Sequence, residues 1–170
     1  MDQNKVRKSL PQAAFDSYSV LVDNPYALLT FVVALFCIIA EANNSYGPLE
    51  LIHNALVEYC QGDGKLKAFA SIMLYIVDLI IPIKLQFFIS LMFLVPAFIK
   101  NDTSTWLCSL AFVALTIFTS IPSWQLFLFS QAYYMYCFVE SSFYKFLIFF
   151  VAFIVLVLGF QHFTSIVGIS

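Results

Sequence analysis

Charge is scarce in this sequence. Only 11% of its 170 residues are Asp, Glu, Lys or Arg, whereas 62% are hydrophobic. This composition excludes an ordinary soluble domain and indicates a chain whose solvent is the lipid bilayer. Glycine is scarce as well: there are five, and the apolar stretches contain no Gly-x-x-x-Gly face along which helix backbones could approach closely. Packing is therefore expected to depend on the abundant aromatic residues, which include 20 Phe.

Residues that could carry out chemistry are also few. The chain has two histidines and four cysteines, whose spacing matches neither a metal site nor a disulfide framework. Cys60 alone lies in a polar segment, where it is either a small hydrophobic residue or a thiol that pairs with a partner. No catalytic Ser or Cys can be matched with a base and an orienting group. We therefore expect no enzyme activity, no metal site and no cofactor.

The charged residues that are present suggest an orientation. The net charge of -2 argues against specific nucleic-acid binding. Lys5, Arg7 and Lys8 form the one basic cluster, and because Lys and Arg beside a first span favour the cytosol, we expect the N-terminus on the cytosolic or inner side. There the cluster could contact anionic lipid or a genome.

The longest apolar stretch runs from Leu66 to Ile99. As one helix it would reach about 50 Å, whereas a bilayer core is about 30 Å thick. Either Pro82 and Lys84 mark a turn between two short crossings, giving six crossings in the chain, or Lys67 to Asp78 lies at the interface. We favour the second interpretation, with a cytosolic C-terminus and four principal spans at residues 26–40, 79–99, 106–121 and 144–160.

The expected fold is an all-α, polytopic transmembrane helical bundle with about four principal spans and a short amphipathic surface helix. Its parts are an inner N-terminal segment at 1–24, the bundle at 25–160 and a C-terminal tail at 161–170. Residues 124–139 are either interfacial or an extra span, because polar residues are scattered through them and their tyrosines suit the headgroup level.

The surface helix is expected at residues 48–61, on the outer or lumenal side. Apolar residues recur there at spacings of three and four, Pro48 suits the first helical turn, and Gly62 follows the last one. The opposite side of this helix is polar. Its candidate partner-contact residues are Glu50, His53, Asn54 and Glu58.

Asp78 and Lys84 are the ionisable residues deepest in apolar surroundings, which makes them candidate intramembrane groups. Six residues apart on a straight helix, they would point in directions about 240° apart. We expect them to be boundary residues and not a direct pair.

Two Asn-x-Ser/Thr sequences begin at Asn43 and Asn101, and both are candidate glycosylation sites. With a cytosolic N-terminus and one crossing at 79–99, Asn43 is lumenal and Asn101 is cytosolic. The hairpin alternative would make both lumenal.

The layout resembles a known family. A basic N-terminus, a first span, the segment Asn-Ser-Tyr-Gly-Pro-Leu-Glu at 44–50 that opens a short amphipathic helix, and three further aromatic-rich spans are similar to the small virion membrane proteins of negeviruses, cileviruses and related plant and insect viruses. The resemblance covers about residues 20–160. It implies a structural protein of the viral envelope, made at the host endoplasmic reticulum membrane. Its implied partners are the lipid bilayer, further copies of itself and a viral glycoprotein.

Two other functions fit the same residues. Short aromatic helices with few glycines also suit an accessory subunit of a large membrane complex, such as a respiratory assembly of the mitochondrial inner membrane. A transporter or channel that uses Asp78 and Lys84 is the third hypothesis, and neutralising both residues would separate it from the other two.

Overall fold

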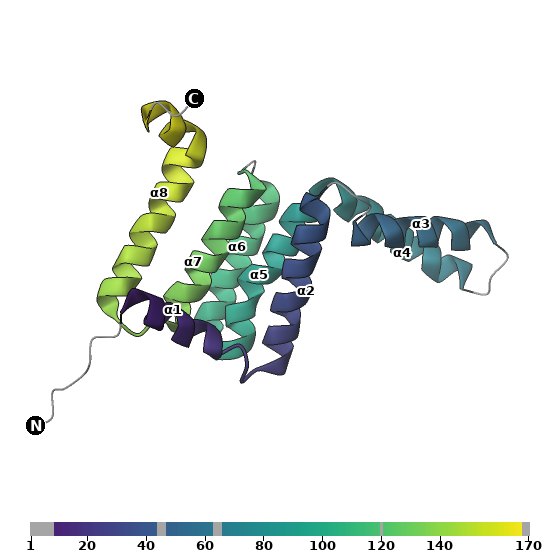
Figure 1. Ribbon diagram of the computed structural model, residues 1–170. Helices are drawn as coiled ribbons and strands as arrows, with labels where there is room; N and C mark the ends of the chain where they lie inside the picture. Colours follow the sequence, from purple (N-terminus) through teal and green to yellow (C-terminus); the bar gives the residue numbers. More distant parts are fainter. Residues whose placement is uncertain (1–8, 44–46, 63–65, 120, 168–170) are drawn as a thin grey trace, which may run out of the picture.

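The computed structural model describes residues 9–43, 47–62, 66–119 and 121–167, with side chains as far as Leu156, and these residues are almost entirely helical (Figure 1). The elements are α1 (Leu10–Ser19), α2 (Pro25–Ala42), α3 (Pro48–Gln61), α4 (Lys67–Ile80), the 3₁₀ turn η1 (Ile81–Ile83), α5 (Lys84–Lys100), α6 (Thr103–Phe118), α7 (Ser123–Phe138) and α8 (Ser142–Val167). The predicted all-α class is confirmed.

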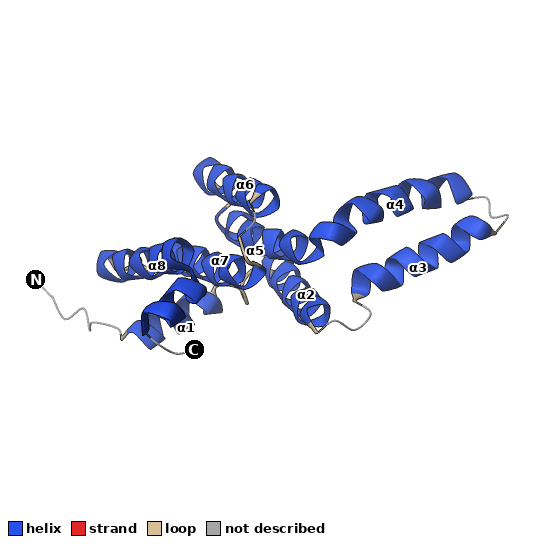
Figure 2. Ribbon diagram, turned by 90° about the horizontal axis from the view of Figure 1, so that it is seen from above, coloured by secondary structure: helices blue, strands red, loops and turns tan. Residues whose placement is uncertain are grey.

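Helix α5 is the centre of a bundle. It packs against α2, α6 and α7, while α8 packs on the outer side of α7. Figure 2 shows this arrangement from above, with α5 surrounded and α8 at the edge. Phe93 lies at the middle of α5 and is fully buried, with its ring centroid 5.4 Å from that of Phe112 and 5.7 Å from that of Phe129. Aromatic rings from neighbouring helices therefore pack against one another and hold the helices together. A chain with few glycines depends on such contacts, because its helix backbones cannot approach closely.

Short polar residues cap the starts of bundle helices α2 and α6. The Asn24 side chain accepts a hydrogen bond from the Ala27 N–H at 3.1 Å and caps α2, while its Nδ2 donates to the Phe98 carbonyl at 3.2 Å. The start of α2 is thus tied to the end of α5, so the two helices are antiparallel. Asp102 caps α6 by accepting from the Thr105 N–H at 2.8 Å. This cap starts α6 at Thr103, earlier than the expected residue 106.

The long apolar stretch bends at Pro82. Proline has no N–H to donate to the preceding turn, and the chain passes through η1 between α4 and α5. Helix α4 turns aside and packs against α3, and the pair projects sideways from one end of the bundle (Figure 1). We call the α3–α4 pair the arm. The sequence predicts a helix at 79–99; helix α5 begins only at Lys84, because Leu79 belongs to the arm.

Helix α1 lies across the opposite end of the bundle (Figure 1). The Tyr134 hydroxyl, on α7, donates to the Ser17 carbonyl at 2.8 Å, and the Tyr18 hydroxyl donates to Gln131 Oε1 at 2.9 Å. The Tyr18 and Tyr134 rings stack with centroids 4.9 Å apart. Tyr134 is only 1% exposed, because α1 covers it. Residues 124–139, left open by the sequence, form bundle helix α7.

Helix length and composition identify two candidate membrane spans in the described part of the chain. These are Pro25–Ala42 and the bent Lys67–Lys100 stretch, whereas Thr103–Phe118 and Ser142–Leu156 are apolar but shorter. By this measure two spans, and not the expected four, are long enough. Helix α8 also continues to Val167, into the segment expected as a tail.

Candidate functional site: the hinge and the arm

Three charged side chains meet where the arm leaves the bundle. Glu41 comes from the end of α2, Glu50 from the first turn of α3 and Lys84 from the first residue of α5. Lys84 Nζ lies 2.8 Å from Glu41 Oε2 and donates a hydrogen bond to Glu50 Oε1. The Glu41 side chain is 0% exposed, that of Lys84 is 28% exposed and that of Glu50 is 29% exposed. We call these three residues the hinge cluster.

Glu41 also positions the backbone of the arm. Its Oε1 accepts from the Leu49 N–H at 3.3 Å, and so supplies a partner for a donor that the first turn of α3 cannot satisfy. Gly47 makes this approach possible, because a Cβ there would lie 2.1 Å from Glu41 Oε2. The Glu41 carboxylate therefore packs directly against the first turn of α3. The direction in which the arm leaves the bundle depends on this contact.

The hinge cluster carries two carboxylates and one ammonium group. The hydrogen bond from Lys84 lowers the pKa of Glu50 below its ordinary range, because it favours the charged carboxylate. Glu50 Oε2 is buried and has no hydrogen-bond partner among the described residues. With all three groups ionised, the cluster keeps one uncompensated negative charge.

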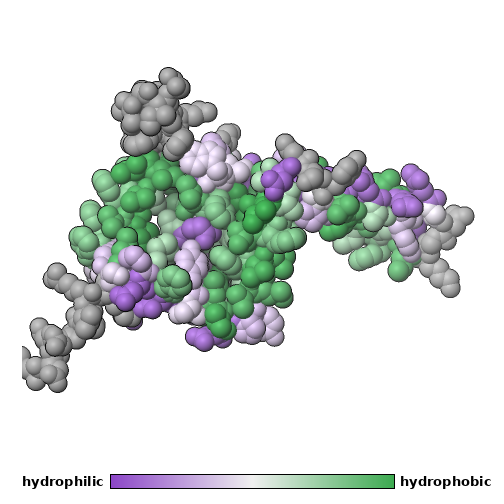
Figure 3. All heavy atoms as spheres, viewed as in Figure 1, coloured by the Kyte–Doolittle hydropathy of each residue, from purple (hydrophilic) through white to green (hydrophobic). Residues whose placement is uncertain are grey.

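The two helices of the arm join along a polar side. His53 Nε2 lies 3.1 Å from Asp78 Oδ1, and Cys60 Sγ lies 3.7 Å from Ser71 Oγ. Figure 3 shows hydrophilic residues along the upper edge of the arm, away from the level of the bundle. Other exposed polar residues of the arm are Asn54, Glu58 and Lys67.

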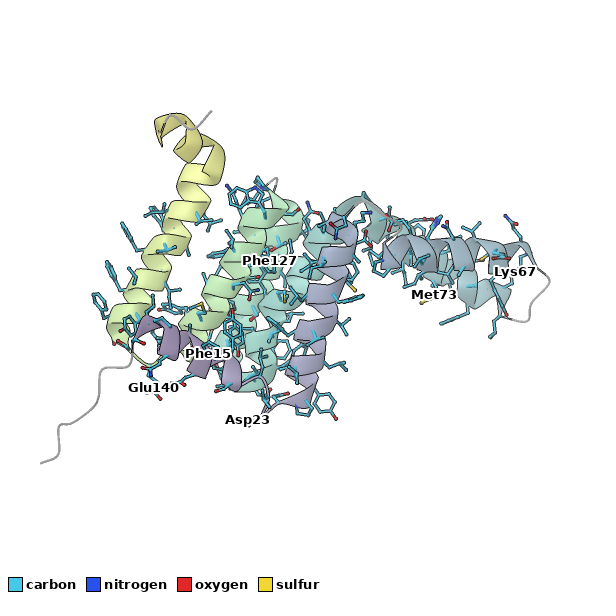
Figure 4. The ribbon with its side chains drawn as sticks, viewed as in Figure 1. Phe15, Asp23, Lys67, Met73, Phe127 and Glu140 are labelled. Carbon is cyan, nitrogen blue, oxygen red and sulfur yellow. The ribbon has the colours of Figure 1, made fainter. Side chains whose placement is uncertain are left out.

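The other side of the arm is apolar and exposed. Figure 3 shows hydrophobic residues along the lower edge of the arm, and Figure 4 places Met73 towards that edge and Lys67 near the tip. Most of this surface comes from α4, whose exposed apolar residues recur at spacings of three and four. The apolar face of the arm consists of Ile52, Tyr59, Phe69, Ile72, Ile76 and Leu79.

The structure separates the four candidate partner-contact residues into two pairs. Glu50 and His53 are engaged within the chain, by Lys84 and Asp78 respectively, whereas Asn54 and Glu58 are exposed. Helical periodicity places all four on one side of α3, but it cannot show that neighbouring helices supply opposite charges.

Asp78 and Lys84 lie in separate contacts. Asp78 pairs with His53 on the surface of the arm, and Lys84 belongs to the hinge cluster. The two candidate intramembrane groups therefore do not form one relay. Glu41 was missed as a site residue, because in the sequence it only closes an apolar stretch; the Gly-Pro pair at 47 and 48 is the signal that a tight approach follows.

The candidate glycosylation residues lie at opposite ends of the bundle. Asn43 follows α2 at the arm end, where its Nδ2 donates to the Ile39 carbonyl at 3.0 Å. Asn101 follows α5 at the α1 end with φ 49°, a conformation that Asn tolerates, and its Oδ1 accepts from Trp106 Nε1 at 3.4 Å. The predicted basic contact of Lys5, Arg7 and Lys8 lies outside the described residues.

Within the described ranges, no group of three or more His, Cys, Asp and Glu residues is arranged to hold a metal ion. The model of one protein family matches residues 10–166, a range that runs from α1 into the last turn of α8. This family, SP24, is described as "Putative virion membrane protein of plant and insect virus". No curated protein and no solved structure matches the chain.

Proposed function

Because this chain belongs to the SP24 family of virion membrane proteins of plant and insect viruses, we propose that it is a non-catalytic structural protein that packs laterally in the viral membrane. The resemblance drawn from the sequence is confirmed by this match. The family description supports a virion membrane protein over the alternative, an accessory subunit of a respiratory assembly.

The observation that carries the proposal is the apolar outer surface of the bundle, which accompanies several small polar residues in its interior. Ser109, Thr116 and Ser130 are buried between helices, and the Ser109 and Tyr133 hydroxyls share a hydrogen bond at 3.1 Å. Large apolar side chains instead cover the outer surfaces of α2, α6 and α8. An exposed apolar surface of this extent is expected where lipid replaces water. Its members include Leu29, Phe36, Leu107, Leu110, Phe143, Phe146 and Phe149.

The bundle helices α2, α5, α6, α7 and α8 are proposed to cross the membrane together. Helices α5, α6 and α7 have 17, 16 and 16 residues, and are therefore about 24 to 26 Å long. This length suits the endoplasmic reticulum bilayer, whose core is about 27 Å thick. Five crossings would put the C-terminus on the arm side, in place of the cytosolic C-terminus that four crossings predict.

Basic residues indicate which end faces the cytosol. Lys100 ends α5 and Lys145 lies in the first turn of α8, both at the α1 end of the bundle. At the arm end Lys84 is already held by two carboxylates. Together with Lys5, Arg7 and Lys8, which precede α1 in the sequence, these two lysines outnumber the three lysines of residues 65–84, which supports a cytosolic or inner α1 end and a lumenal or outer arm.

Lateral packing would use the outer faces of α6 and α8. Leu107 and Leu110 of α6, with Phe146 and Phe150 of α8, are exposed and face away from the bundle core. We propose that further copies of the chain and lipid share these surfaces. A viral glycoprotein would contact the polar side of the arm, at Asn54 and Glu58, on the outer face of the membrane.

Cysteine cross-linking in native membranes tests this packing. Variants that keep only one natural cysteine are compared: Cys108 is exposed on α6, and Cys137 is half-buried on α7. Mild oxidation should give disulfide-linked dimers with Cys108 and few with Cys137. A further variant, Phe146→Cys, places a single cysteine on the exposed face of α8. Equal cross-linking through Cys108 and Cys137 would contradict packing through these faces, and so would the absence of cross-linking through both Cys108 and Phe146→Cys. Release of the chain from membranes by alkaline carbonate would contradict the membrane-spanning proposal itself.

A further inference from the structure

We propose that the arm lies in the interfacial region of one leaflet of the membrane that the bundle crosses, with the apolar face of α4 in contact with lipid. The inference rests on the proposed function, because the bundle defines the plane of that membrane. The partner is a lipid surface, namely the headgroups and upper acyl chains of the leaflet around the protein.

The first argument is that both helices of the arm are amphipathic and in register. On α4 the polar residues Lys67, Ser71 and Asp78 recur at spacings of four and seven, so they share one side. The contacts of His53 with Asp78 and of Cys60 with Ser71 join this side to the polar side of α3. The apolar sides of the two helices consequently face the same way, as a single surface.

The second argument is the level of the arm. Glu41 lies in the last turn of α2 and Lys84 is the first residue of α5, so the hinge cluster holds the arm where the bundle helices end. The arm projects sideways at that level, and its apolar edge faces the level of the bundle (Figure 3). An amphipathic helix in this position buries its apolar side about 5 to 10 Å into the headgroup and acyl boundary.

The third argument is chemical. Tyr75 is exposed on α4 between the polar residues and the apolar face, and Tyr59 and Phe69 are exposed at the edges of that face. Tyrosines such as Tyr59 and Tyr75 are enriched at the headgroup level, because they combine an apolar ring with a polar hydroxyl. Among the described residues of the arm, the polar side mixes Lys67 with Glu58 and Asp78, so these residues form no basic surface for anionic lipid. The arm should therefore lie on neutral lipid as well as on anionic lipid.

Site-directed spin labelling of the full chain tests this inference in phosphatidylcholine vesicles. Single nitroxides are placed at Ile72→Cys and Ile76→Cys on the apolar face, and at Asn54→Cys and Glu58→Cys on the polar side, with the four natural cysteines replaced by serine. Oxygen concentrates in lipid and a neutral nickel chelate in water. The ratio of oxygen to nickel accessibility should exceed one at the apolar labels, fall below one at the polar labels, and stay unchanged when phosphatidylserine is added.

A label at Phe150→Cys, exposed on α8, separates the two proposals. If it reports lipid while the labels at Ile72 and Ile76 report water, the arm does not lie in the membrane and this inference is wrong. If Phe150 also reports water, the proposed bundle function fails. Protection of the Ile72 and Ile76 labels from both reagents would show that protein covers the face, and lipid contact only with phosphatidylserine would show a basic surface; either result overturns the inference.

Discussion

Replacing Lys84 with methionine should loosen the arm. The variant keeps an unbranched side chain that is one atom shorter, and it leaves Glu41 as a fully buried carboxylate with only the Leu49 N–H as a hydrogen-bond donor. Removing one partner of a buried ion pair costs about 3 to 5 kcal/mol, whereas an exposed pair contributes about 0 to 1 kcal/mol. Since Lys84 itself is 28% exposed, we expect about 3 kcal/mol, the lower end of the buried range.

Hydrogen exchange measures this loss where it occurs. Because about 1.4 kcal/mol corresponds to a tenfold change, the amides at the start of α3 should exchange about a hundredfold faster in Lys84→Met than in the natural chain. The amides of α5 around Phe93, in the bundle core, should change little. Lys67→Met removes an exposed lysine of the same arm, so it is the matched control, with an expected change within about 0.5 kcal/mol.

The double variant Glu41→Gln with Lys84→Met decides whether the charges are coupled. Glutamine keeps an oxygen for the Leu49 N–H and removes the stranded charge. The double variant should therefore recover about 2 kcal/mol relative to Lys84→Met alone. If the effects of the two single variants simply add in the double variant, the hinge cluster is not a coupled unit and the reasoning is refuted.

Three further results are expected. Gly47→Ala should speed exchange in α3 nearly as much as Lys84→Met, because its Cβ would lie 2.1 Å from Glu41 Oε2 and displace the carboxylate; little further change on a Glu41→Ala background, where the side chain no longer reaches residue 47, would identify that clash as the cause. Tyr134→Phe removes the hydroxyl that donates to the Ser17 carbonyl, so α1 should lose about 1 kcal/mol of protection in exchange experiments while the arm is unaffected. The pKa of Glu50 is lowered in the folded chain, so Glu50 stabilises the hinge at pH values above 4.5, the ordinary pKa of glutamate. This stabilisation is lost as the pH falls through the lower pKa that Glu50 has in the folded chain. Arm protection should accordingly hold from neutral pH to about 5.5 and decline only below about 4.5, and Glu50→Gln should flatten that decline.

The sequence predicted the helices well where apolar periodicity and capping residues agree. Residues 48–61 were expected as an amphipathic helix and form α3, because Pro48 and Gly62 bound a pattern that is visible locally. Helix α6 begins before the expected residue 106, because the Asp102 side chain caps it from outside the apolar stretch. Hydropathy alone does not register such a cap.

The candidate site could be predicted only in part, because its contacts join residues far apart in the chain. Glu50 and Lys84 were each singled out, yet their pairing depends on the bend at Pro82, which brings α5 back to the start of α3. The exposed face of α4 could not be assigned either. A stretch of apolar residues has the same hydropathy whether it crosses a membrane or lies along its surface, and only the partner helix distinguishes the two.

The arm also gives the molecule unequal ends. Two helices of 14 residues lying side by side cover an area about 21 Å long and about 20 Å wide, whereas α1 at the other end is a single helix of 10 residues, about 15 Å long. Each copy thus has a larger footprint at the arm end than at the α1 end. In the lateral packing proposed above, a layer of copies that all point the same way would be wider on the arm side and would curve with that side outward.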